Sequence, residues 1–313
     1  MNDRGPIEIN GVLIEPEFAE AFDMKATAIV LTARDEFWLQ QTTAAMIGFG
    51  TSVIACGVEI AVDSALTPDQ TPDGRPGNRL LAFATSGKLL SKQIATRIGQ
   101  CVLTCPSAAA FAGMDPAATP PSKRVAMGSN IRFFGDGDQI SKQFGGRRYW
   151  RVPVMDGEFL CEHESGRQDG IGGGNFLIIG RTADSVYRAT RAAMAAVATV
   201  PDVITPFPGG AARSGSKVGS KYDALFASTN TAYCPTLRSV DGSLLADDEF
   251  AVLEVVIDGL SFDAVARATR VGIIAACESV GGGGGLTRIT AGNYGGKLGR
   301  HHFQLHDVMR TGG

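Results

Sequence analysis

The sequence lacks a long apolar run and a strong excess of either charge. Its 313 residues include 29 Lys and Arg against 32 Asp and Glu, which leaves a formal net charge of −3. That balance gives no general attraction to nucleic acid or to anionic lipid. The apolar runs are too short to span a bilayer, and the N-terminal segment carries charges where a secretory signal needs an apolar core. We therefore expect a cytoplasmic protein that binds neither nucleic acid nor membrane.

Cysteine is also scarce for a protein built on disulfides. The six cysteines lie scattered through mostly apolar segments, at Cys56, Cys101, Cys105, Cys161, Cys234 and Cys277. In a chain of this length the pattern favours reduced, buried thiols. Cys56 or Cys234 could still carry an acyl group as a thiolate nucleophile, although neither has a histidine partner visible in the sequence.

The motifs of nucleotide-binding enzymes are missing as well. Gly48-Phe49-Gly50 and Gly135-Asp136-Gly137 lack the third glycine of a dinucleotide fingerprint. Gly87-Lys88 and Gly296-Lys297 lack the upstream glycine of a phosphate-binding loop. The glycine run at 281–285 is interpreted as a flexible connection, because no helix start follows it. We expect neither a nicotinamide cofactor nor nucleotide hydrolysis.

Histidine is too sparse to indicate a metal site. Three of the four histidines cluster near the C-terminus, at His301, His302 and His306. On a strand, His302 and His306 would share a face but lie roughly 13 Å apart, too far to bind one ion. We expect no metal.

Glycine and alternating apolar segments dominate what is present. The 40 glycines exceed the usual share of about 7% and indicate many tight turns. Apolar patterns predict strands at 12–14, 28–32, 51–56, 80–84, 149–154, 176–179, 251–257 and 302–305. Helical spacing predicts helices at 37–47, 90–104, 183–199 and 262–277, with Asp184 and Ser261 at or near helix starts.

Two parts of the chain resemble each other. Residues 80–105 and 253–278 each combine an apolar strand, a turn and a helix that contains Arg97-Ile98-Gly99 or Arg270-Val271-Gly272. Gly174-Asn175-Phe176 and Gly292-Asn293-Tyr294 form a second pair. Two related halves that meet near residue 150 would explain both pairs. Chance similarity between two amphipathic helices is the alternative.

One carboxylate inside an apolar strand is the clearest candidate for chemistry. Glu254 lies in a run, 250–257, that is otherwise apolar at both parities. A carboxyl group in such surroundings pairs with a cation or keeps its proton with a raised pKa. In the protonated form it could stabilise an oxyanion. The alternative is an edge strand from which Glu254 reaches solvent or pairs with an arginine.

Polar segments that lack hydrophobic periodicity are candidate binding loops. They concentrate hydroxyls, amides, lysines and permissive glycines, at 214–221, 228–230, 233–235 and 293–297. Merely solvated loops are the alternative interpretation, and these residues alone name no substrate.

Several longer blocks resemble the formylmethanofuran:tetrahydromethanopterin formyltransferase family. Two of them are Thr71-Pro72-Asp73-Gly74-Arg75-Pro76-Gly77 and Ala291-Gly292-Asn293-Tyr294-Gly295-Gly296-Lys297-Leu298-Gly299. Others lie at 8–12, 48–53, 97–102, 133–137, 173–176, 206–210, 216–221 and 227–230. The resemblance covers nearly the whole chain.

The resemblance implies a fold, an assembly and a reaction. The fold is α+β, with two duplicated ferredoxin-like α/β sandwich lobes at residues 1–150 and 151–313, and the assembly is a homotetramer with the site near a subunit contact. The reaction is direct aminolysis, in which N5 of tetrahydromethanopterin attacks the formyl group of a methanofuran-type amine through a tetrahedral oxyanion. The family's catalytic glutamate falls on Glu254, which as a neutral acid would donate a hydrogen bond to the oxyanion.

The resemblance also implies how the carriers are held. Both are acidic, so Lys217, Lys221 and Lys297 are expected to anchor them. The full set of expected substrate contacts is Asn175, Ser216, Lys217, Ser220, Lys221, Ser228, Thr229, Asn230, Tyr233, Asn293 and Lys297. Methanofuran or methylofuran and tetrahydromethanopterin act as substrates, and no tightly bound cofactor is expected.

The modest net charge favours a mesophilic, bacterial member of the family. Such a chain is similar to the formyltransferase subunit of a formyltransferase/hydrolase complex that serves formaldehyde oxidation in methylotrophs, so partner subunits are expected. Two alternatives stay open. One is a non-catalytic scaffold subunit, and the other is a thiol-dependent acyltransferase that uses Cys234 or Cys56.

Overall fold

The computed structural model describes residues 5–280 and 283–310, which form two compact units. Unit 1 comprises the chain up to Asp23 and from Ile171 onward, and unit 2 comprises Met24–Gly170. The chain passes into unit 2 within strand β3 (Phe18–Thr32) and returns within strand β12 (Gln168–Gly180). The sequence analysis divided the chain at residue 150 instead. The units differ from that division because residues 13–14 and 18–21 pair with strands near the C-terminus.

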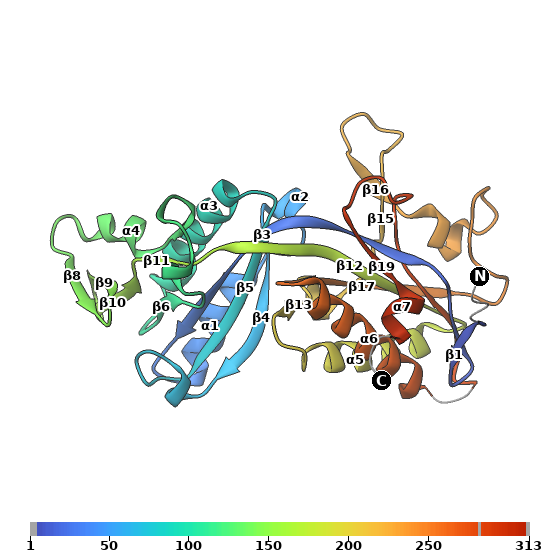
Figure 1. Cartoon of the computed structure of the whole chain (residues 1–313), viewed down its shortest axis with the longest axis horizontal. Coiled ribbons are helices and arrows are strands. Elements are labelled where there is room, and N and C mark those ends of the chain that lie inside the picture. Colours follow the sequence, from blue (N-terminus) through green and yellow to red (C-terminus); the bar gives the residue numbers. More distant parts are fainter. Residues whose placement is uncertain (1–4, 281–282, 311–313) are drawn as a thin grey trace. The chain divides into compact units, whose positions relative to one another are not determined.

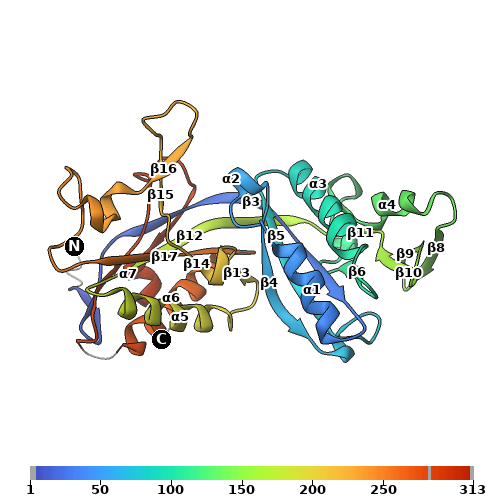
Figure 2. The same ribbon diagram turned by 180° about the vertical axis from the view of Figure 1, so that it is seen from behind.

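Unit 1 carries helices on one face of a mostly antiparallel sheet (Figure 1). Its other strands are β1 (Ile7–Ile9), β2 (Val12–Ile14), β13 (Val203–Ile204), β14 (Ala211–Ala212), β15 (Ser216–Val218), β16 (Ala227–Thr229), β17 (Ala251–Gly259), β18 (Leu286–Thr290) and β19 (His301–Gln304). Its helices are α5 (Ala183–Val197), α6 (Phe262–Ser279) and α7 (Leu305–Arg310). Figures 1 and 2 show α5 and α6 side by side under the sheet, with the β15–β16 hairpin projecting on the other side.

The strand order of unit 1 brings β17 into the interior of the sheet. The order is β1-β2-β18-β12-β17, and β13 and β14 pair with the far edge of β17. Only the short β2–β18 pair is parallel among these pairings in the described part of the chain. The start of β3 pairs separately with β19.

The alternation of β17 decides where Glu254 points. Val255 and Ile257 are fully buried in the core between the sheet and helices α5 and α6. Because successive side chains on a strand point to opposite faces, Glu254 faces away from these helices. Leu177 of β12 and Ala212 of β14 are its partners on either side. The edge-strand alternative for Glu254 is therefore wrong.

Unit 2 is a second sheet with helices. Its strands run in the order β4-β5-β3-β6-β10-β9-β8. They are β4 (Glu59–Leu66), β5 (Gly77–Ala84), β6 (Ala109–Ala112), β8 (Ile140–Phe144), β9 (Arg147–Val154) and β10 (Gly157–Glu162), and β7 (Val125–Ala126) pairs with β11 (Glu164–Ser165). The helices are α1 (Glu36–Ile47), α2 (Val53–Cys56), α3 (Gly87–Arg97) and α4 (Gly128–Ile131).

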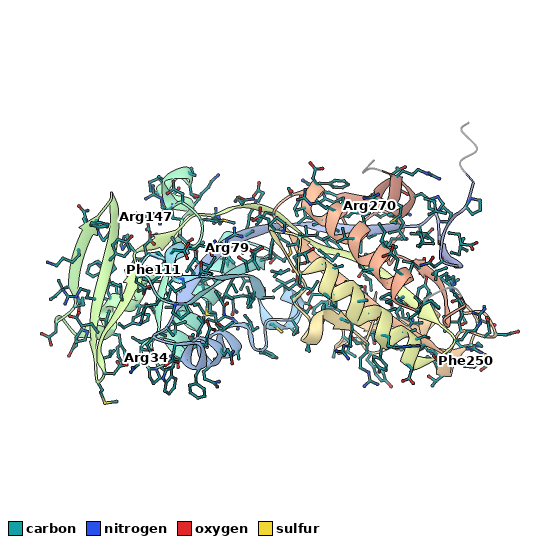
Figure 3. The ribbon with its side chains drawn as sticks, turned by 90° about the horizontal axis from the view of Figure 1, so that it is seen from below. Arg34, Arg79, Phe111, Arg147, Phe250 and Arg270 are labelled. Atoms are coloured by element: carbon teal, nitrogen blue, oxygen red, sulfur yellow. The ribbon has the colours of Figure 1, made fainter. Side chains whose placement is uncertain are left out.

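Apolar side chains cluster on both faces of the unit 2 sheet. Ile29 and Leu31 of β3 are buried in a core that includes residues of α1 and α3. Val30 points to the opposite face, where it clusters with Phe111. The ring of Tyr149 packs edge-on against Phe111, which Figure 3 labels, with ring centroids 6.3 Å apart. Unit 2 therefore has a hydrophobic core of its own.

Most of the expected elements are confirmed, together with the α+β class. The strands expected at 12–14, 28–32, 80–84, 149–154, 176–179 and 251–257 fall within β2, β3, β5, β9, β12 and β17. The helices at 37–47, 183–199 and 262–277 correspond to α1, α5 and α6. Among the described residues no helix is long and apolar enough to cross a membrane.

The strand expected at 51–56 is wrong, because this segment contains helix α2. The first amide of that helix, Val53 N, donates to Glu59 Oε1 at 2.8 Å, and Gly57 ends the helix with a φ of 74°. A carboxylate at a helix start and a left-handed glycine at its end favour a helical turn over an extended strand. Neither effect is visible in the apolar pattern that predicted the strand.

Two further expectations are wrong in their boundaries. The helix expected at 90–104 ends at Arg97, where a π-helical turn (Ile98–Val102) follows. The strand expected at 302–305 ends at Gln304, because Leu305 begins α7. His302 and His306 therefore do not share a strand. The glycine run expected as a flexible connection lies partly outside the described residues, at 281–282.

The two similar segments have the same local build. Strand β5 leads through Ser86 into α3, and β17 leads through Ser261 into α6. Each serine hydroxyl accepts from a backbone N–H of the first helical turn at 3.2 Å. Ser261 is thus confirmed as a cap, whereas α5 is capped by Thr182 and Asp184 lies one residue inside its first turn.

The packing of the unit 1 core predicts how a substitution there changes the free energy of unfolding. Phe176 of β12 is fully buried between the sheet and its helices. We expect Phe176→Ala to lower the free energy of unfolding by about 3–5 kcal/mol, as for other buried aromatics. Urea denaturation measures this change, with Phe144→Ala as the control because Phe144 is 79% exposed. Equal effects of the two changes would contradict the assigned core.

Candidate active site

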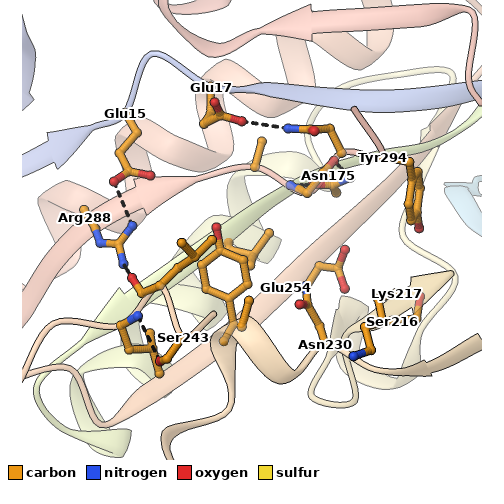
Figure 4. Close-up of a pocket in the computed structure, with 18 of the residues that line it drawn as sticks. Glu15, Glu17, Asn175, Ser216, Lys217, Asn230, Ser243, Glu254, Arg288 and Tyr294 are labelled. Atoms are coloured by element: carbon orange, nitrogen blue, oxygen red, sulfur yellow. Dashed lines mark hydrogen bonds and ion pairs between the residues drawn. The ribbon is translucent and has the colours of Figure 1, made fainter. Parts of the chain in front are cut away.

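A pocket of about 990 Å³ lies in unit 1 on the sheet face to which Glu254 points. This volume is in the range of pockets that bind small molecules. Residues expected from the sequence are among those that line it: Asn175, Ser216, Lys217, Asn230, Tyr233, Glu254 and Asn293. Segments far apart along the chain therefore meet at this pocket. Figure 4 shows several of the residues that line it.

Glu254 stands in this pocket without a partner (Figure 4). Its side chain keeps some exposure toward the pocket, and its carboxyl group forms no hydrogen bond or ion pair within the described part of the chain. Desolvation by the surrounding protein raises the pKa of Glu254 to about 7, because burial disfavours the charged form. The carboxyl group is therefore available as a neutral acid near neutral pH.

Tyr294 lies beside Glu254 in the pocket (Figure 4). Burial raises the pKa of its phenol, the Ser216 hydroxyl lies within hydrogen-bonding reach, and the nearby charge of an ionised Glu254 raises the pKa further. Tyr294 therefore keeps its proton at neutral pH and can donate a hydrogen bond. The sequence analysis missed it as a site residue, although an aromatic side chain in a polar, glycine-rich loop was a usable signal.

Asn175 and Asn293 line the pocket but use their side-chain amides on the protein itself. Asn175 Oδ1 accepts from Gly292 N at 2.6 Å, and Asn175 Nδ2 donates to Gly292 O at 3.0 Å. Asn293 Nδ2 donates to Glu17 Oε2 at 2.7 Å, and its Oδ1 accepts from Gly295 N at 3.0 Å. These asparagines shape the pocket wall by holding its backbone.

Arg288, which sequence reasoning missed, organises the other end of the pocket (Figure 4). Its Nε and Nη2 atoms donate to the two carboxylate oxygens of Glu249, each at 2.8 Å, and its Nη1 donates to Glu15 at 2.7 Å. Burial opposes ionisation of Glu249, but the hydrogen bonds from Arg288 and others lower its pKa to about 2. Arg288 is therefore already neutralised by carboxylates and is poorly placed to attract an acidic carrier.

Lys217 is the expected anchor that the structure brings to the pocket. It lies on β15, and its Nζ donates to Thr231 Oγ1 at 3.0 Å. The side chain is otherwise exposed. Lys217 is thus a cation near Glu254 that Thr231 positions and that solvent can reach.

The other expected contacts lie outside the residues that line this pocket. They are Ser220, Lys221, Ser228, Thr229 and Lys297. The hydroxyls of Ser228 and Thr229 donate to Gly219 O at 2.7 Å and to Ser214 O at 3.4 Å, which ties the β15–β16 hairpin together. Lys221 and Lys297 are exposed.

The two cysteine candidates belong to different units. Cys234 is in unit 1, where its Sγ donates to Asn230 O at 3.2 Å. It does not line the 990 Å³ pocket, but together with Glu254 it lines a small cavity of about 40 Å³. Cys56 is buried in unit 2. No group of three or more His, Cys, Asp or Glu within residues 5–280 and 283–310 could hold a metal ion.

Comparison with protein families identifies the class to which this fold and pocket belong. Residues 7–154 match a family described as formylmethanofuran-tetrahydromethanopterin formyltransferase, and residues 157–308 match the proximal lobe of the same enzymes. The chain belongs to this family, and it is an enzyme that transfers formyl groups.

Individual relatives agree over nearly their full length. The chain is 59% identical to the formylmethanofuran–tetrahydromethanopterin formyltransferase of Rhodopirellula baltica, with 97% of this chain and 93% of the relative covered. It is 48% identical to a subunit of the formyltransferase/hydrolase complex of Methylorubrum extorquens, with 96% and 97% covered.

Solved structures give the same result. A chain of the formyltransferase/hydrolase complex of Methylorubrum extorquens, determined in complex with methylofuran, superposes with a TM-score of 0.92 at 46% identity, covering 98% of this chain and 99% of that one. The formyltransferase of Methanosarcina barkeri gives a TM-score of 0.88 at 39% identity, covering 96% and 100%.

The raised pKa of Glu254 predicts how a substitution changes stability with pH. The pKa is about 7 in the folded protein and 4.5 as the ordinary value, so the folded state binds the proton more tightly and loses stability as the pH rises between these values. Glu254→Gln removes this loss. We expect the variant to gain stability relative to the parent from about pH 5 to about pH 8, as measured by urea denaturation.

Glu249→Gln is the matched control because its expected effect has the opposite sign. The pKa of Glu249 is lowered to about 2, so its ionised form stabilises the fold above the ordinary value of 4.5 and this contribution is lost as the pH falls toward 2. The control should therefore be destabilised at neutral pH. A Glu254→Gln effect that does not change with pH would contradict the raised pKa.

Proposed function

We propose that this pocket transfers a formyl group between a formylated methanofuran-type amine and N5 of tetrahydromethanopterin by direct aminolysis. The observation that carries the proposal is the unpartnered carboxyl group of Glu254, whose pKa of about 7 keeps an acid available at neutral pH. Membership of the formyltransferase family supports the choice of carriers. The pocket volume of about 990 Å³ suits the joining of two carrier ends.

The reaction needs a hydrogen-bond donor and no external reagent. N5 of the pterin attacks the formyl carbon, a new C–N bond forms, and the carbonyl oxygen becomes an oxyanion. The bond from this carbon to the furan-linked nitrogen then breaks, and the proton lost by N5 ends on the leaving amine. Protonated Glu254 donates to the oxyanion, where the hydrogen bond is strongest as charge develops. No acyl-enzyme forms.

Lysines are proposed to hold the acidic parts of the carriers. Lys217 lies at the pocket and is positioned by Thr231, so it can bind a carboxylate or phosphate close to the reaction. Lys221 and Lys297 are exposed outside the pocket lining and would contact more distant parts of the carriers. The hydroxyls and amides of Ser216, Asn230 and Tyr233 complete the binding surface.

The assembly is proposed to be a homotetramer in the cytoplasm that works with other subunits in formaldehyde oxidation and holds no resident cofactor. The β15–β16 hairpin, which begins beside the pocket, exposes large apolar side chains, at Val218, Tyr222, Leu225 and Phe226. An exposed apolar group of this kind is typical of a protein contact. The naming of a Methylorubrum extorquens relative as a complex subunit supports partners of other kinds.

A single substitution tests the role of Glu254. We expect Glu254→Gln to lower kcat for formyl transfer by about 10²–10³-fold, because the amide cannot match an acid at a developing oxyanion. In the parent, kcat should fall as the pH rises through about 7, where Glu254 loses its proton. The assay is formyl transfer between the furan carrier and the tetrahydropterin with purified protein.

Cys234→Ser is the matched control for the thiol alternative. Cys234 lines a small cavity together with Glu254, but the proposed reaction uses no thiol, so replacing its Sγ by the hydroxyl of similar size should leave kcat nearly unchanged. Undiminished transfer by Glu254→Gln would refute the acid role, and a collapse of transfer in Cys234→Ser would restore the thiol mechanism.

A further inference from the structure

A second glutamate, Glu20, holds the loop that carries Tyr294. Glu20 lies on β3 and is fully buried. Its Oε2 accepts from the backbone N–H of Tyr294 at 2.7 Å and of Gly296 at 2.9 Å. Its Oε1 accepts from Leu298 N and Gly299 N, each at 2.6 Å. One carboxylate therefore binds four amides of a single loop, residues 293–299.

The charge of Glu20 is stabilised by these amides. Within the described chain it forms no ion pair with Lys, Arg or His. Burial alone would raise its pKa, but the four backbone hydrogen bonds outweigh burial and lower it. An ionised carboxylate that depends on backbone donors fixes the positions of those donors closely, because each missing bond leaves charge uncompensated.

The loop needs this support because its own backbone is irregular. Gly295 and Gly296 have φ values of 75° and 70°, which only glycine adopts at little cost. Residues 294–298 form turns and bends, and Gly299 lies in no helix or strand, so no regular hydrogen-bond ladder satisfies these amides. Glu20 takes the place of that ladder.

The held loop presents Tyr294 to the end of the pocket at which Glu254 lies. The Tyr294 ring packs against Phe22, with centroids 6.0 Å apart, and its phenol lies within hydrogen-bonding reach of the Ser216 hydroxyl. Tyr294 stands beside Glu254 in Figure 4. The backbone amide of the same residue is bound to Glu20. The amide that Glu20 binds and the phenol in the pocket thus belong to the same residue, Tyr294.

We propose that Tyr294 is a second hydrogen-bond donor to the reacting formyl group and that Glu20 is the positioning residue that sets its place. Tyr294 keeps its proton throughout and contributes only a hydrogen bond. Two donors on one oxyanion share its charge, and both must be in place before the charge develops. This inference rests on the proposed function at Glu254, since that carboxyl group marks the reaction end.

A double-mutant cycle on formyl transfer tests the link between the two residues. We expect Tyr294→Phe to lower kcat by about 10- to 100-fold through loss of one donor. Glu20→Gln turns an NH₂ group toward two backbone donors, and we expect a similar fall because the loop shifts. The double variant should be no slower than the slower single variant, because both changes remove the same hydrogen bond.

Hydrogen exchange measures the positioning directly, without substrate. In Glu20→Gln the amides of Tyr294, Gly296, Leu298 and Gly299 should exchange faster than in the parent. The matched control is Glu162→Gln, because Glu162 is also buried and accepts from Ala112 N, but in unit 2. That control should change neither kcat nor exchange in the 293–299 loop. If Glu20→Gln does not fold, Glu20→Asp, which keeps the charge and shortens the reach, takes its place in the cycle.

The outcomes separate this inference from the role of Glu254. Any of three results would overturn the positioning inference. They are a loss of kcat in the double variant equal to the product of the two single losses, unchanged amide exchange in Glu20→Gln, and full kcat in Tyr294→Phe. Full kcat in Glu254→Gln would overturn the proposed acid instead. Even then, the double-mutant cycle would still measure how strongly Glu20 and Tyr294 are coupled in their effect on kcat.

Discussion

The unpartnered carboxyl group of Glu254 is the constraint on which the site depends. The two-residue period of β17 sends its neighbours Val255 and Ile257 into the core and turns Glu254 to the pocket. Since no cation or amide of the described chain binds the carboxyl group, desolvation alone sets its pKa, at about 7. An arginine in reach would keep Glu254 ionised and remove the acid on which the proposed mechanism depends. That mechanism therefore requires a carboxyl group that no cation of the protein neutralises.

Three glutamates in unit 1 show how partners decide the state of one side chain. Glu254 has no partner and its pKa rises, Glu249 is bound by Arg288 and its pKa falls to about 2, and Glu20 is bound by four amides and its pKa also falls. The two ionised groups hold structure, Glu249 by fixing Arg288 and Glu20 by fixing a loop. Of these three glutamates, Glu254 alone is free to act on a substrate.

The sequence predicted those features that depend on neighbouring residues, namely the strand period and the helix starts. The period of β17 marked Glu254 as a carboxylate in an apolar strand, and Ser261 marked the start of α6. Contacts between distant segments could not be predicted from these local patterns. Glu20 and Tyr294 lie 274 residues apart, and nothing near Glu20 in the sequence indicates that it binds a loop. Likewise, Lys297 shares a loop with Tyr294, yet only the fold shows that Tyr294 lines the pocket and Lys297 does not.

The same long separation constrains when the site can form. Unit 1 takes its first strands from the N-terminus and the rest from beyond Ile171, so unit 2 is synthesised while unit 1 is incomplete. Until Gly299 has emerged, Glu20 lacks the amides that stabilise its charge, and burying it alone would be costly. The start of β3 also lacks its partner β19 until then. Burial of Glu20, pairing of β3 with β19 and placement of Tyr294 therefore all require the same C-terminal segment, residues 294–304.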